Sequence, residues 1–96
     1  MANGIIKSNL SNGLSVLNEV SDLNNAKLSG NSGISVFSYA STASNNPGIT
    51  GGRVLVIGLN TSQYFSQIAF PNGSSSTSAY IRNGYNNGFT EWKSLV

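Results

Sequence analysis

The chain has 96 residues, a net charge of +2, no cysteine and no histidine. Its length suffices for one small domain, and its few Lys and Arg residues are scattered, so the clustered cations of a nucleic-acid-binding protein are missing. Without Cys or His, disulfides, thiolate metal sites and a Ser-His-Asp triad are excluded.

Residues 1–20 form an N-terminal stem or linker whose structure the sequence leaves open. The helix-like spacing of Leu10, Leu14 and Leu17 is interrupted by Asn12-Gly13, which is also a hairpin-turn signal. A short helix, a hairpin and an extended stem therefore all remain. In each case so small a domain leaves apolar groups uncovered, including Ile5 and Ile6, which favours packing against another copy of the chain.

The same segment bears on localisation. Met1 to Leu10 lacks the continuous apolar core of a signal peptide, and no apolar stretch approaches the ~20 residues that span a bilayer. We therefore expect no membrane insertion. Export within an assembled particle would suit a low-charge surface rich in Asn, Ser, Thr and Gly, which is typical of an extracellular or virion β-protein.

The stretch Ser21 to Lys27 predicts a turn or a single helical turn. Its Ser, Asp and Asn side chains bond readily to the local backbone. We expect Leu23 to anchor this turn and Asp22 to cap it. We place a β-domain over residues 21–96.

A first strand is predicted over Ile34 to Ala40, followed by a twelve-residue polar loop, Ser41 to Gly52. The loop contains the turn Asn46-Pro47-Gly48, and the pair Gly51-Gly52 indicates a bend. A loop of this length in a small domain is functional or poorly ordered.

The longest apolar run, Val54 to Ile57, predicts the central strand. Its residues are β-branched except for Leu55, and apolar side chains fall on both faces of the strand. Strands of this kind are usually covered on both sides. A four-residue connection, Asn60 to Gln63, and a second strand, Tyr64 to Phe70, complete a central hairpin.

Two further strands are expected near the C-terminus, Ser78 to Asn83 and Phe89 to Val96, joined by the polar turn Gly84 to Gly88. The count after residue 33 is then five strands, with no convincing long helix. The fold class predicted is all-β: a small antiparallel β-sheet or sandwich of about five to seven strands with long polar loops.

Acid–base catalysis is not expected. Asp22 and Glu91 are the only acidic residues after residue 20, and each has a simpler role, as a turn cap and as a solvated or cross-strand partner. We therefore predict that the protein is not an enzyme and uses neither a cofactor nor a metal.

Aromatic and amide side chains are the candidates for recognition, because aromatic faces pack on sugar C–H faces while amides and guanidinium groups bond hydroxyls. Trp92 and two of the Tyr residues have a simpler role in a small core. Tyr85 differs because it is predicted to lie inside a polar turn. The candidate glycan-binding residues are Tyr80, Arg82, Tyr85, Asn86 and Asn87. The alternative is an ordinary turn whose Asn residues tolerate positive φ.

Several segments, taken in order, resemble the pyocin-knob family, whose modules lie near the C-terminus of phage tail fibres, related particles and some depolymerases. They are Asp22–Asn24, Asn46–Gly48, Gly51–Ile57, Ser66–Phe70, Tyr80–Asn83 and Asn87–Leu95. The resemblance covers Ser21 to Val96.

The resemblance implies a knob-like β-domain of a virion fibre, normally homotrimeric, that acts outside the cell in attachment to a host. We expect a receptor-binding module that recognises bacterial surface polysaccharide and contacts other fibre segments or virion proteins. The alternative is a structural module that trimerises or caps a fibre. The resemblance makes Trp92 and Ile81 core positions and Gln67 and Arg82 recurrent polar positions. A fibre also needs a shaft, so we expect a longer parent protein.

Overall fold

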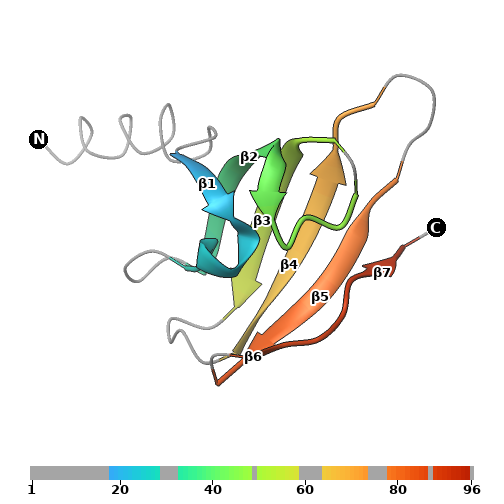
Figure 1. Cartoon of the computed structure of the whole chain (residues 1–96). Coiled ribbons are helices and arrows are strands. Elements are labelled where there is room, and N and C mark those ends of the chain that lie inside the picture. The colour runs from blue at the N-terminus through green and yellow to red at the C-terminus, as the bar shows by residue number, and fades with distance from the viewer. Residues whose placement is uncertain are drawn as a thin grey trace, which may run out of the picture.

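The computed structural model describes residues 18–28, 33–48, 50–58, 64–73, 78–86 and 88–95. These residues form a single curled β-sheet with almost no helix (Figure 1). Its elements are β1 (Asn18–Asp22), the 3₁₀ turn η2 (Leu23–Asn25), β2 (Ile34–Ser44), β3 (Gly52–Gly58), β4 (Tyr64–Pro71), β5 (Tyr80–Tyr85), β6 (Gly88–Phe89) and β7 (Lys93–Ser94). The all-β prediction is confirmed.

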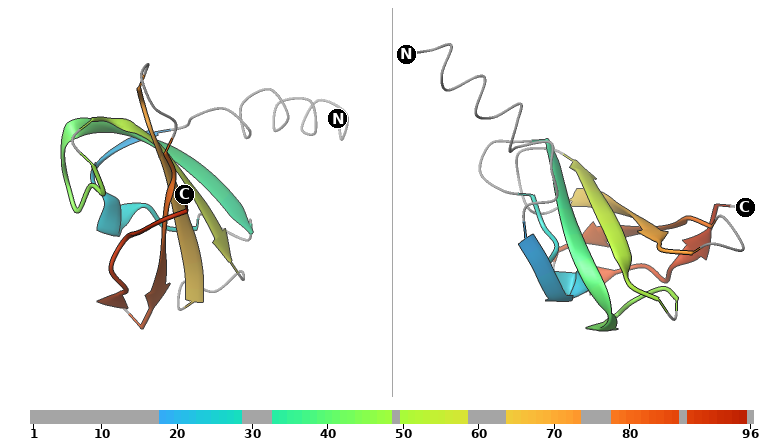
Figure 2. Two further views of the ribbon diagram at one scale, coloured as in Figure 1. Left: turned by 90° about the vertical axis from the view of Figure 1, so that its right-hand side faces the viewer. Right: turned by 90° about the horizontal axis from the view of Figure 1, so that it is seen from above.

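The strands follow the order β1-β2-β3-β4-β5-β6, and β7 also pairs with β5. All pairs are antiparallel except the first, because β1 runs parallel to β2. The predicted antiparallel sheet is therefore a mixed sheet. The parallel pair arises because η2 and the residues after it lead the chain back across one face of the sheet before β2 begins (Figure 2).

Several predicted strand ends are wrong. β2 continues to Ser44, where it pairs with Asp22 after an irregularity in β1, so the following loop is shorter than twelve residues. Gly52 does not form a bend but begins β3. The last predicted strand is divided into β6 and β7 by residues 90–92, giving six described strands after residue 33 instead of five. The connection expected at residues 60–63 and the stem residues 1–17 lie outside the described residues.

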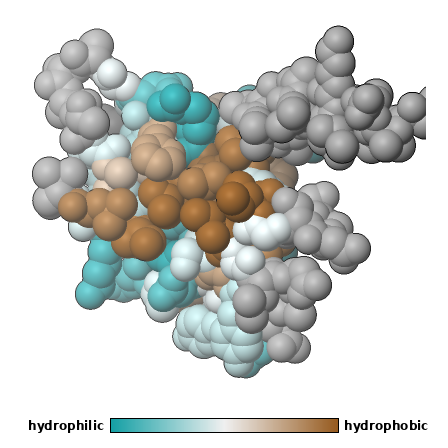
Figure 3. Space-filling model, turned by 180° about the vertical axis from the view of Figure 1, so that it is seen from behind, coloured by the Kyte–Doolittle hydropathy of each residue, from teal (hydrophilic) through white to brown (hydrophobic). Residues whose placement is uncertain are grey.

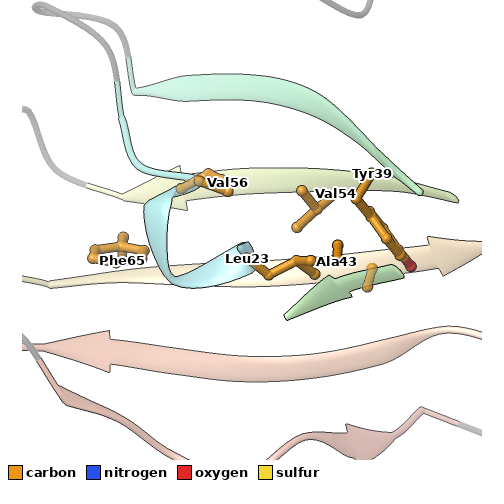
Figure 4. Close-up of a cluster of buried hydrophobic side chains, with 8 residues drawn as sticks. Leu23, Tyr39, Ala43, Val54, Val56 and Phe65 are labelled. Atoms are coloured by element: carbon orange, nitrogen blue, oxygen red, sulfur yellow. The ribbon is translucent and has the colours of Figure 1, made fainter. Parts of the chain in front are cut away.

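The alternation of side chains gives the sheet an inner and an outer face. Leu23 and Ala26, from η2 and the residue after it, are fully buried against the inner face, on which Val54 and Val56 are also fully buried. Figure 4 shows Leu23 directed toward the strands that carry these valines. Leu23 is therefore the anchor that the sequence predicts, and the core lies between η2 and the sheet.

Tyr39, Ala43 and Phe65 extend this core along the sheet (Figure 4). The Tyr39 hydroxyl is buried and has no hydrogen-bond partner among the described residues, and burial raises the pKa of this side chain. Trp92 is half-buried and packs against the core, in agreement with its expected role.

Within the part of the chain that the structure describes, the central strand β3 is covered on its inner face only. Leu55 is half-buried and Ile57 is 40% exposed on the outer face. Among the described residues the expected cover of the second face is missing, because they form one sheet and η2 packs on one side of it. No helix among the described residues has the length and apolarity to cross a bilayer.

Asp22 caps η2, as predicted. Its carboxylate accepts a hydrogen bond from the Asn24 backbone N–H at 2.9 Å and another from Asn45 Nδ2 at 2.8 Å. The Asn45 bond and then the Asn24 bond hold the pKa of Asp22 below its usual value. The cap thus also joins η2 to the end of β2.

Candidate functional site

The predicted glycan-binding residues lie on opposite faces of the sheet. Tyr80 and Arg82 both lie on the inner face of β5, whereas Tyr85 lies on the outer face. Asn86 follows β5 in a tight turn, with φ of 45°, and Asn87 lies outside the described residues. The structure therefore does not bring Arg82 and Tyr85 together on one surface.

Arg82 is held inside the domain and is only 6% exposed. Its Nε donates to Gln67 Oε1 at 2.7 Å and its Nη2 donates to Asn24 Oδ1 at 2.8 Å. The guanidinium lies 4.0 Å from the ring centroid of Phe89 and 4.5 Å from that of Trp92. These contacts use two of its five N–H donors and place the guanidinium against two aromatic rings, so its role is to hold η2 and the C-terminal residues on the sheet.

Burial lowers the pKa of Arg82 to about 10, although the nearby carboxylate of Asp22 opposes this shift. The group is still charged at neutral pH. Arg82 also contributes to a polar hollow of about 600 Å³ beside Trp92. Trp92 Nε1 donates to the Asn45 carbonyl at 2.8 Å, which fixes the indole ring at this hollow.

Tyr85 ends strand β5 and is not in the turn, contrary to the prediction. Its partner across the sheet is Tyr64, the first residue of β4. Tyr64 is 54% exposed and Tyr85 is 48% exposed. The Cβ atoms of two residues paired in this way lie about 5 Å apart on one face of the sheet. The two phenol rings thus form one aromatic surface at the end of the outer face.

A hollow of about 570 Å³ adjoins this tyrosine pair. Its lining consists of Ile57, Gly58, Tyr64, Phe65, Ser66, Asn83, Gly84, Tyr85 and Thr90. A side chain at position 84 could not be accommodated, because the Phe65 ring occupies the space that a Cβ would need. The floor of the hollow is therefore apolar and closely packed.

Polar groups stand next to the tyrosines on the same strands. Ser66 Oγ donates to Asn83 Oδ1 at 2.7 Å, and Thr90 Oγ1 accepts from the Asn83 backbone N–H at 2.9 Å. Asn83 is exposed, and its Nδ2 has no hydrogen-bond partner among the described residues. No charged side chain among the described residues lines the hollow. Two aromatic faces with amide and hydroxyl groups suit a neutral, hydroxyl-rich ligand.

Sequence reasoning named Tyr64 among the aromatic residues but did not pair it with Tyr85. The two residues are 21 positions apart in the sequence, and the alignment of β4 with β5 brings them together. Predicting this pair would therefore have required the register of the two strands. The residues that the structure describes contain no group of three or more His, Cys, Asp or Glu that could hold a metal ion.

A scan against protein-family models and searches of curated proteins and of solved structures find no match to this chain.

Proposed function

We propose that this domain is the attachment module of a virion fibre and binds a polysaccharide of the host-cell surface at the Tyr64–Tyr85 hollow. The observation that supports binding is the pair of half-exposed tyrosines aligned across β4 and β5. The sequence resemblance of Ser21 to Val96 to pyocin-knob modules supports the assignment to a fibre.

The tyrosine pair is suited to sugars because its rings are presented on strands. Antiparallel neighbours within a sheet hold the two Cβ atoms at a fixed spacing, so little backbone order has to be gained on binding. A pyranose ring can pack its C–H face on one phenol ring, and its hydroxyls can bond the Tyr hydroxyls and the exposed side-chain amide of Asn83.

The uncharged lining of the hollow restricts the ligand class. Among the described residues, this lining contains neither Lys, Arg, Asp nor Glu, so an acidic sugar held there would lose hydration without gaining an ion pair. We therefore expect a neutral polysaccharide. Adsorption should change little between low and high salt, because screening weakens interactions between charges.

The experiment compares Tyr64→Ala and Tyr85→Ala with the unaltered protein on an array of purified bacterial surface polysaccharides. Each substitution removes one stacking surface that is exposed before binding, so the melting temperature should stay nearly unchanged. Affinity should fall about tenfold for each, which corresponds to roughly 1.4 kcal/mol.

Tyr85→Phe is the matched control because it keeps the ring and removes only the hydroxyl. It should retain most of the affinity that Tyr85→Ala loses. If folded Tyr64→Ala and Tyr85→Ala proteins bind every polysaccharide as tightly as the unaltered protein does, this hollow is not the binding site.

A further inference from the structure

The Tyr64–Tyr85 hollow continues along strand β5 beyond the tyrosine pair. A second hollow, of about 440 Å³, is lined by Ile81, Arg82, Asn83, Thr90, Glu91 and Lys93. Asn83 and Thr90 line both hollows. The two hollows are therefore neighbouring parts of one groove, which we call the β5 groove.

Strand register places the side chains along this groove. Alternation along β5 puts Ile81, Asn83 and Tyr85 on the outer face of the sheet. Lys93 is paired with Ile81 across β5 and β7, so its side chain stands on the same face. From Tyr85 to Ile81 the strand covers roughly 13 Å. The β5 groove thus extends well beyond the tyrosine pair, in the direction of the strand.

The residues between β6 and β7 form one wall of the β5 groove. The Thr90 backbone N–H donates to the Asn83 carbonyl at 2.9 Å, and Thr90 Oγ1 accepts from the Asn83 backbone N–H at 2.9 Å. These two bonds hold the segment against β5. The wall is therefore in place before a ligand binds, so little backbone order has to be gained on binding.

Ile81 gives the second hollow an apolar floor. Register aligns Ile81 with Ile68 on β4, and Ile68 with Leu55 on β3. In Figure 3, which views the molecule from behind, hydrophobic surface extends across the middle of this face. A sugar ring can rest its C–H face on such a surface while its hydroxyls are directed to the polar wall.

The second hollow, unlike the first, carries charges of both signs. Glu91 and Lys93 are exposed, and neither side chain forms an ion pair or a hydrogen bond with another described residue. Arg82 also lines this hollow, but its guanidinium donates to Gln67 and Asn24. Two hydroxyls on adjacent carbons can donate to one carboxylate, and an ammonium can donate to a further hydroxyl. The two exposed charges are therefore available to an uncharged sugar.

We propose that the β5 groove binds several consecutive sugars of a neutral polysaccharide, one on the tyrosine pair and the next between Ile81, Glu91 and Lys93. This rests on the proposed function, because the tyrosine pair is the first contact. A neutral chain is the occupant because an acidic sugar would meet the Glu91 carboxylate and a basic sugar the Lys93 ammonium. A single terminal sugar would leave part of the groove empty.

The first test varies the length of the ligand. The polysaccharide that binds most tightly on the array is cut by partial acid hydrolysis into oligosaccharides of graded length, and calorimetry measures the dissociation constant of each. A single sugar can contact only one part of the groove, so affinity should rise at least about tenfold as the chain lengthens and then stay constant. Equal affinity for the single sugar and the longest chain would overturn the proposal.

The second test removes the two charges one at a time. Glu91→Gln and Lys93→Met keep the size of exposed side chains, so the melting temperature should stay nearly unchanged. Each should lower the affinity for the longest oligosaccharide about five- to tenfold, because a charge-assisted hydrogen bond is lost. Glu91 also borders the polar hollow beside Trp92, whereas Lys93 does not, so Lys93→Met is the decisive variant.

Glu19→Gln and Lys27→Met are the matched controls. They make the same substitutions away from the groove, on β1 and just after η2. Binding by both proteins should equal that of the unaltered protein.

The outcomes separate this proposal from the proposed function. If Tyr85→Ala weakens binding while Glu91→Gln and Lys93→Met do not, the tyrosine hollow binds the ligand and the rest of the β5 groove does not. If Glu91→Gln strengthens binding, the ligand is acidic and the neutral chain is wrong. If folded Tyr64→Ala and Tyr85→Ala proteins bind normally, the proposed function fails whatever the length series shows. Binding of no polysaccharide at all would overturn both.

Discussion

At the scale of single residues, Gln67 is the side chain on which the inner face depends. It is fully buried, and its Nε2 donates to the carbonyls of Leu23 and Ala26, each at 2.7 Å. Its Oε1 accepts from Arg82 Nε. One amide therefore satisfies two carbonyls of the η2 region and orients the guanidinium that stacks on Phe89 and Trp92.

We expect Gln67→Leu to lower the free energy of unfolding by about 3 kcal/mol. The substitution keeps a similar volume but removes the partners of the Ala26 carbonyl and of the Arg82 Nε–H, and each such group costs about 1–3 kcal/mol. The Leu23 carbonyl keeps its bond from the Ala26 backbone N–H at 3.2 Å. Urea unfolding measures the change.

Ser66→Ala, on the adjacent residue, is the comparison. It removes a hydrogen bond to the exposed Asn83, and its cost should stay within about 1 kcal/mol. Equal stability of the Gln67→Leu and Ser66→Ala proteins would mean that the buried network does not hold η2.

Local contacts at this scale were predictable and distant ones were not. The cap formed by Asp22 and the anchor formed by Leu23 depend on residues within a few positions along the chain. Two of the bonds of Gln67 join residues more than 40 positions apart, and the pairing of Tyr64 with Tyr85 depends on strand register. The resemblance singled out Gln67 and Arg82 as polar positions but gave them no role.

At the scale of the strands, alternation within β3 was predicted correctly, whereas the covering of its two faces was not. Val54 and Val56 are buried, while Leu55 and Ile57 lie on the less covered face. An apolar run indicates that both faces of the strand favour burial. It does not indicate whether residues of the same chain bury both faces. Strand ends were missed where Gly, Asn or Ser suggested a loop, as at Ser44 and Tyr85, because pairing with a neighbouring strand outweighs local preference.

Val56→Asp should abolish cooperative folding. Val56 is fully buried between Ser35 and Gln67 in the sheet, and an unpaired buried carboxylate costs several kcal/mol, which is comparable to the whole stability of a small domain. Circular dichroism with thermal melting measures this.

Arg53→Asp provides the control for Val56→Asp, since it places the same residue at an exposed position of the same strand and should fold. A soluble Val56→Asp protein with an unaltered melting curve would contradict the assignment of β3 to the core.

At the scale of the whole molecule, the described residues cover the two faces of the sheet differently. The inner face is packed against η2 and its neighbours, whereas the outer face carries the exposed side chains of Ile34, Ile57 and Phe70. The homotrimer implied by the sequence resemblance stays a prediction. The mass of the unaltered protein in solution distinguishes it from a dimer, since a trimer contains three chains of 10.0 kDa.

The parallel pairing of β1 with β2 also bears on the order in which the domain folds. Strands β2 to β5 pair with their neighbours in sequence, so each hairpin closes a comparatively short loop. β1 has no hairpin route to its place: η2 must first cross the sheet and reach Gln67, 44 positions away from Leu23. Loop closure of this kind delays non-local contacts.

We therefore expect β1 and η2 to join a preformed meander and to detach from it before the rest unfolds. Native-state hydrogen exchange should show the amides of Val20 and Ala26 opening at a lower free energy than those of Val54 and Val56. Uniform protection across all four would instead mean that the sheet opens as one unit. If β1 does open first, tension applied through the residues before Asn18 would release this strand while the tyrosine pair on β4 and β5 stayed folded.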